Sequence, residues 1–104
     1  MRVPSGIVQQ AEIDRRVKAI ARKLAPDVVR IRYNIGSDWT GDSSIFFRIL
    51  LSDEASREER LAEVADRVES RLLEALKPAE LGLLAYFSFR SQSEQADLRE
   101  EAWA

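Results

Sequence analysis

Two neighbouring segments of this chain place apolar and polar side chains in near-strict alternation: residues 28–35 (VVRIRYNI) and residues 45–51 (IFFRILL). A period of two carried by β-branched and aromatic residues is typical of strands with one buried face. Turn-forming residues dominate the connection, residues 36–44, so the two strands are expected to form an antiparallel hairpin. The side expected to face the core holds Val29, Ile31, Tyr33 and Ile35, followed by Ile45, Phe47, Ile49 and Leu51.

Helical periodicity precedes the hairpin, in residues 8–25. Its apolar residues recur at spacings of four, three and four, which place them on one side of a helix: Ile13, Val17, Ile20 and Leu24. Pro26 then ends the helix, because the residue before a proline disfavours helical backbone angles. The opposite side is basic. Its Arg15, Lys18 and Arg22 are candidate nucleic-acid contacts, although helices commonly display such charges only to remain solvated.

A second helix is expected after the hairpin. Ser56 and Glu59 have the spacing of an S-x-x-E capping box, which would open this helix, and Pro78 and Gly82 bracket its end. Its buried stripe is expected to hold Leu61, Val64, Ala65, Val68, Leu72, Ala75 and Leu76.

Residues 83–90 (LLAYFSFR) alternate again and predict a third strand. Its inward side is expected to hold Leu83, Ala85, Phe87 and Phe89. Ser91 and Glu94 form a second capping box, which predicts that residues 92–104 form a short terminal helix.

The expected order of elements is therefore α-β-β-α-β-α, in one α+β domain over residues 1–104. The first two helices each carry one apolar stripe, so both can pack on the same face of a three-stranded sheet. By this order the chain resembles type II KH domains and the ribosome-binding-factor-like proteins. The KH family clamps phosphates with a GXXG loop. No two glycines of this chain have that spacing, so the resemblance concerns the fold.

The chain contains no cysteine and no histidine. Zinc, copper and iron–sulfur sites usually need thiolate or imidazole ligands, and most catalytic triads and dyads need one of these side chains. We therefore expect no cofactor, no metal site and no disulfide. The first residues lack the apolar stretch of a secretory signal, and the longest apolar run is too short to span a bilayer. These features predict a cytoplasmic protein with no membrane partner.

The segment from Gly36 to Ser43 approaches a phosphate-binding loop, because its glycines have the G-x-x-x-x-G spacing. Asp42 stands where that motif needs a lysine, and a carboxylate there would repel phosphate, so this function is rejected. Asp38 and Asp42 could bind a hard cation or act with Ser43 in a small enzyme. Such residues more commonly hydrogen-bond their own backbone in a turn, and we favour that interpretation. Trp39, in the same connection, either folds back onto the domain or stays available to a partner.

The side of the sheet opposite the expected core is rich in arginine and aromatic residues. Its strand positions hold Val28, Arg30, Arg32, Asn34, Phe46, Arg48, Leu50, Tyr86, Ser88 and Arg90. Three occupants suit this surface. The terminal helix could cross it, using Leu98 and Trp103, with Glu94 and Glu101 answering the arginines. A second protein or another copy could cover it. A single-stranded nucleic acid could stack on its aromatic rings.

The leading hypothesis is a non-catalytic protein–protein interaction module, either homo-oligomeric or an accessory or inhibitor-like subunit of another protein. Its predicted partner-binding residues are Arg30, Arg32, Trp39, Phe46, Arg48, Tyr86, Arg90 and Trp103. RNA or single-stranded DNA binding through the same face is the alternative, and a small enzyme that uses the hairpin carboxylates is the third hypothesis.

Overall fold

The computed structural model describes residues 9–104, so residue 8, where the first helix was predicted to begin, lies outside the described part. The observed elements are α2 (Gln10–Lys23), β1 (Val28–Ser37), β2 (Ser43–Leu51), α3 (Glu58–Leu76), the 3-10 turn η1 (Pro78–Leu81), β3 (Leu84–Ser91), α4 (Gln92–Leu98) and the 3-10 turn η2 (Glu101–Trp103). This order confirms the predicted α-β-β-α-β-α arrangement.

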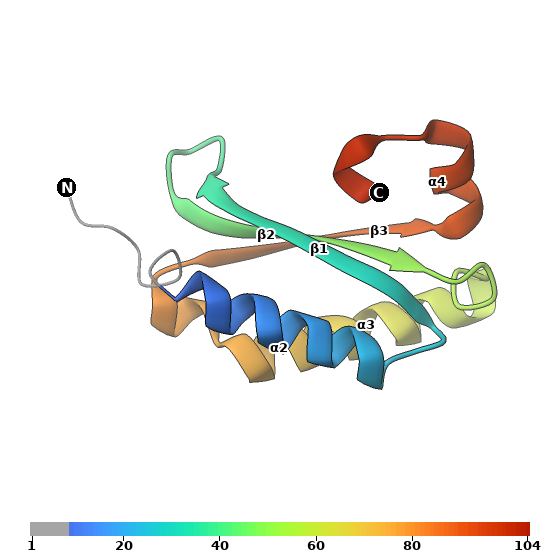
Figure 1. Ribbon diagram of the computed structural model, residues 1–104, viewed down its shortest axis with the longest axis horizontal. Coiled ribbons are helices and arrows are strands. Elements are labelled where there is room, and N and C mark those ends of the chain that lie inside the picture. The colour runs from blue at the N-terminus through green and yellow to red at the C-terminus, as the bar shows by residue number, and fades with distance from the viewer. Residues whose placement is uncertain (1–8) are drawn as a thin grey trace.

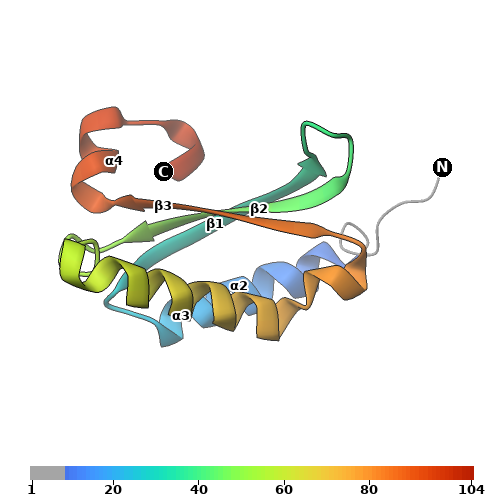
Figure 2. The same ribbon diagram turned by 180° about the vertical axis from the view of Figure 1, so that it is seen from behind.

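The three strands form one sheet in the order β1-β2-β3. β1 and β2 are antiparallel, whereas β2 and β3 are parallel and are connected across the sheet by α3. Figures 1 and 2 show α2 and α3 side by side on one face of the sheet, as predicted. The turn between β1 and β2 and the chain after β3 both rise on the other face, at opposite ends.

The core lies between the helices and the sheet. Phe47, Ile49 and Leu51 of β2 are at most 1% exposed, because β2 is the central strand. The helices contribute the stripes that their periodicity predicts: Ile13, Val17 and Ile20 from α2, and Val64, Val68, Leu72 and Leu76 from α3. Leu61 was also predicted to be buried, and this is wrong: it is 38% exposed, since the first turn of α3 extends past the sheet.

The predicted facing of the first β1 residues is also wrong. The register between β1 and β2 shifts between Val28 and Arg30, which marks a β-bulge. The extra residue turns Val28 into the core, where it is 2% exposed, and leaves Val29 40% exposed. Strict alternation resumes after the bulge, so Arg30 and Arg32 lie on the predicted side.

The two predicted capping boxes have different outcomes. The Ser91–Glu94 box is confirmed: the Glu94 amide donates to Ser91 Oγ, and the Ser91 amide donates to Glu94 Oε1, both at 3.1 Å. The Ser56 box is wrong, because α3 begins two residues later, at Glu58, without a side-chain cap. The Ser56 hydroxyl instead donates to the Ser52 carbonyl at 2.9 Å, which closes the turn after β2.

No helix between residues 9 and 104 has the length and the apolar character needed to cross a membrane.

Candidate functional site

The face of the sheet opposite the helices is called the arginine face here; it carries Arg30, Arg32, Phe46, Arg48, Tyr86, Ser88 and Arg90. Residues 92–104, the C-terminal segment, fold back over one end of it (Figure 2). Trp103 anchors this segment and is 8% exposed. The guanidinium carbon of Arg90 lies 4.4 Å from the centre of the Trp103 ring, a cation–π contact.

The arginines hold the C-terminal segment mainly through its backbone carbonyls. Arg30 Nη2 donates to the carbonyl of Trp103 at 3.0 Å, and Arg48 Nε donates to that of Ala102 at 2.7 Å. Arg32 Nε donates to the carbonyl of Ala104. The last carbonyls of a helical turn have no partner within the turn, so cationic donors suit them.

Of the three predicted occupants, the chain's own terminal segment therefore covers this end of the face, but with other contacts than expected. Leu98 is 54% exposed and does not anchor the segment. Glu94 is used in its capping box. Among residues 9–104, the acidic partner of Arg90 is Glu100, at 3.3 Å, and Glu101 forms no ion pair.

A contact from the turn after β2 fixes the start of α4. Asp53 accepts hydrogen bonds from the amide and the hydroxyl of Ser93, at 2.9 and 2.6 Å. The bond from the hydroxyl contributes most to lowering the pKa of Asp53, and the bond from the amide lowers it further. This role could not be predicted from the sequence, since the two residues lie 40 positions apart and no local pattern connects them.

The other end of the arginine face carries an aromatic cluster of Trp39, Phe46 and Tyr86. Phe46 and Tyr86 are direct neighbours on β2 and β3, and their rings stack with centroids 5.3 Å apart and an interplanar angle of 14°. The Trp39 ring leans on Tyr86 at 5.4 Å, yet the residue remains 81% exposed. Trp39 therefore folds back far enough to contact Tyr86, as one prediction had it, and still leaves most of its surface exposed, as the other had it.

A hollow of about 390 Å³ separates this cluster from the C-terminal segment. It is lined by Asn34, Phe46, Phe47, Arg48, Tyr86, Ser88 and Trp103. The arginine face therefore has a protruding tryptophan and an adjacent depression.

Asp38 organises the turn that presents Trp39. Its carboxylate accepts bonds from the amides of Thr40 and Asp42, at 2.9 and 3.0 Å, and from the Tyr86 hydroxyl at 2.8 Å. The hydrogen bond from the Thr40 hydroxyl contributes most to lowering the pKa of Asp38, to about 2. The bond to Asp38 in turn raises the pKa of Tyr86. This confirms the prediction that Asp38 serves as a turn residue, because its carboxylate accepts hydrogen bonds from the backbone of its own turn.

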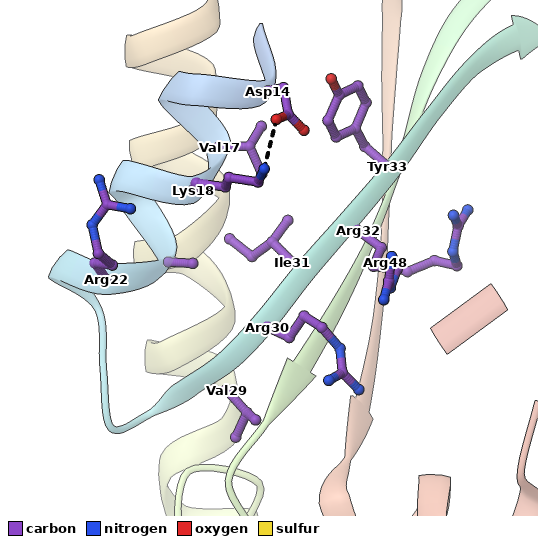
Figure 3. Close-up of a pocket in the computed structure, with 11 residues that line it drawn as sticks. Asp14, Val17, Lys18, Arg22, Val29, Arg30, Ile31, Arg32, Tyr33 and Arg48 are labelled. Atoms are coloured by element: carbon purple, nitrogen blue, oxygen red, sulfur yellow. Dashed lines mark ion pairs between the residues drawn. The ribbon is translucent and has the colours of Figure 1, made fainter. Parts of the chain in front are cut away.

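A second depression, of about 550 Å³, follows the outer edge of β1 and is called the β1 groove here (Figure 3). It is lined by Asp14, Val17, Lys18, Ala21, Arg22, Val29, Arg30, Ile31, Arg32, Tyr33 and Arg48. Two basic groups that sequence analysis treated separately, on α2 and on the sheet, thus meet at this edge. Arg15 does not line the groove; it pairs with Glu12 on its own helix.

The fold and these surfaces define a small α+β domain with a mixed three-stranded sheet, two helices on one face and a chain segment across the other. No protein-family model matches the chain, and no curated protein matches it. Solved structures of the MamM CTD are similar: one has a TM-score of 0.52 at 14% identity and covers 82% of this chain and 98% of its own. Another has a TM-score of 0.52 at 13% identity and covers 81% and 99%. At such identities the likeness shows the fold alone, and it supports the α+β assignment.

Proposed function

We propose that this domain is a non-catalytic protein-interaction module that self-associates through the aromatic cluster and the adjacent hollow. The observation that carries the proposal is Trp39, which is held on the stacked Tyr86 ring and is nevertheless 81% exposed. Tryptophan is one of the residue types enriched at the energetic centres of protein interfaces. Covering its free surface would contribute roughly 4 kcal/mol before the costs of association.

A second copy of the chain is the partner that this surface fits. Trp39 protrudes from the same face that holds the hollow lined by Arg48 and Ser88. A two-fold axis between two copies would let each Trp39 enter the hollow of the other, since such an interface uses the same patch on both subunits. It would also bring Asp42, which lies in the same turn as Trp39, toward Arg48 in the partner's hollow, which adds charge complementarity.

The test is sedimentation velocity over micromolar to millimolar concentrations. We expect a concentration-dependent dimer for the wild-type chain and a monomer for Trp39→Ala. Leu98→Ala is the matched control, because it removes an exposed apolar side chain, 54% accessible, outside the cluster. It should dimerise like the wild type.

A wild-type monomer over the whole range would overturn self-association. So would equal dimerisation of the Trp39→Ala variant. If a single-stranded oligonucleotide bound in a steeply salt-dependent way and Trp39→Ala abolished that binding, the nucleic-acid alternative would replace the present proposal.

A further inference from the structure

The outer edge of β1 offers a second binding surface, separate from the aromatic cluster. β1 pairs with β2 alone, so no strand of the described residues occupies its other edge. The backbone groups along such an edge are a ready template for an added strand. The β1 groove runs along this edge, with α2 as its second wall (Figure 3).

The groove has two chemically different sides. Figure 3 shows Val17 and Ile31 between α2 and β1, whereas Arg30, Arg32 and Arg48 lie on the other side of the strand. Val17 and Ile31 are at most 9% exposed and present an apolar floor, which Ala21 extends. The groove therefore has an apolar floor between α2 and β1, with Lys18 and Arg22 on its helix wall, and it is cationic toward the arginine face.

The arginines on the cationic side retain capacity for a ligand. A guanidinium has five N–H donors, and the C-terminal segment takes only one from Arg30 and one from Arg32. Arg30 Nε also lacks a hydrogen-bond partner among residues 9–104, but it is buried, so the free donors that a ligand can reach are the terminal nitrogens. Asp14, the acidic residue that lines the groove, is already paired with Lys18 at 2.9 Å. The arginines of the groove therefore carry positive charge that no acidic residue of the groove balances, and this favours an anionic ligand.

We propose that the β1 groove binds an extended segment of another protein in which acidic and apolar residues alternate. Such a segment would add a fourth strand to the sheet through main-chain hydrogen bonds. Successive side chains of a strand point to opposite faces. One set would therefore pack on the apolar floor beside α2, while the other would meet the arginines. The alternation required of the ligand follows from the two sides of the groove.

Charge complementarity also selects against a second copy at this edge. β1 itself alternates apolar residues with Arg30 and Arg32, so two β1 strands side by side would bring like charges together. β3 carries no acidic residue, so it could not supply the anionic side chains either. Neither edge strand of a second copy therefore supplies the alternating acidic side chains that the groove requires, which favours a different protein as the ligand.

The probe is a blocked peptide of about eight residues that alternates glutamate and valine. Its control has the same composition, with the glutamates first and the valines after them. Binding is measured by isothermal titration, and hydrogen exchange of the β1 amides is followed by NMR. We expect the alternating peptide to bind at least about tenfold more tightly than the block peptide. We also expect it to slow exchange of the outward amides of β1.

Arg32→Glu should weaken binding of the alternating peptide by about tenfold or more, because it reverses a charge on the cationic side. Arg71→Glu, on the exposed surface of α3, makes the same charge change away from the groove and should leave affinity unchanged. Circular dichroism establishes that both variants fold, and Trp39→Ala should bind the peptide like the wild type. Equal affinity for the two peptides, unchanged β1 exchange, or tighter binding of a single-stranded oligonucleotide would overturn the proposal.

Discussion

Replacement of Trp103 by alanine should release the C-terminal segment from the arginine face while the core beneath remains folded. Trp103 is 8% exposed and meets Arg90 at 4.4 Å. Burial of a tryptophan removes about 200 Å² from water, which at 25 cal/mol per Å² corresponds to 5 kcal/mol. Measured truncations of buried aromatic residues to alanine cost about 3–5 kcal/mol. We take this range for the free energy that holds the segment in place.

The assay is native-state amide hydrogen exchange of α4, compared with that of β2. In Trp103→Ala the α4 amides should exchange at least about a hundredfold faster, or reach the unprotected limit, because 1.4 kcal/mol corresponds to a factor of ten. The β2 amides should keep their protection, since Phe47 and Ile49 pack against the helices.

The second tryptophan of the chain supplies the control. Trp39 is 81% exposed, so Trp39→Ala should change stability by no more than about 0.5 kcal/mol and leave α4 exchange unaltered. Unchanged α4 protection in Trp103→Ala would contradict this prediction, since it would mean that the polar contacts of the segment hold it without the Trp103 ring.

Three further outcomes follow from individual contacts. The folded-state pKa of Asp53 is lowered, so its bonds to Ser93 contribute stability above the unfolded pKa and lose it as pH falls through the folded pKa. The protection factors of the α4 amides, which compare the observed exchange rate with the intrinsic rate at the same pH, should therefore fall on acidification, and Asp53→Asn should remove this fall. Ile49→Ala, at a fully buried position of the central strand, should lower the free energy of unfolding in urea by about 2–5 kcal/mol, and a smaller loss would mean that the core refills the space. Tyr86→Phe removes a donor to Asp38, so the pKa of that carboxyl, followed by NMR, should rise from about 2 toward its ordinary value; no change would assign the shift to the bonds from Thr40 and the Asp42 amide.

Local chemistry explains what could be predicted from the sequence. Alternation in β2 and the stripes of the two helices depend on residues near one another in the chain, and each is observed. The Ser91–Glu94 cap likewise needs only a spacing of three residues. The cap predicted at Ser56 shows the limit of such local patterns. The spacing is the same, but the Ser56 hydroxyl bonds to the Ser52 carbonyl and does not cap α3.

The rest could not be predicted, because it depends on contacts between distant segments or on backbone atoms. The Asp53–Ser93 bonds connect the turn after β2 with the start of α4. The acceptors of Arg30 and Arg48 are backbone carbonyls, which no pattern of side chains reveals. The bulge that turns Val28 inward is a register shift between two strands. The arginines and the aromatic residues were found from alternation alone, but their separation into a covered end and an exposed end required the path of the terminal segment.

A distance between two copies tests the proposed self-association most directly. The natural chain has no cysteine, so a single introduced thiol carries one spin label per copy. Ser37→Cys places the label at the end of β1, next to the turn that carries Trp39 and outside the hollow, and Ser70→Cys places it on α3, on the opposite side of the sheet. Pulsed dipolar spectroscopy should give a shorter distance between copies for position 37 than for position 70, and Trp39→Ala should abolish both couplings. The absence of coupling at both positions, or a shorter distance at position 70, would contradict the proposed interface.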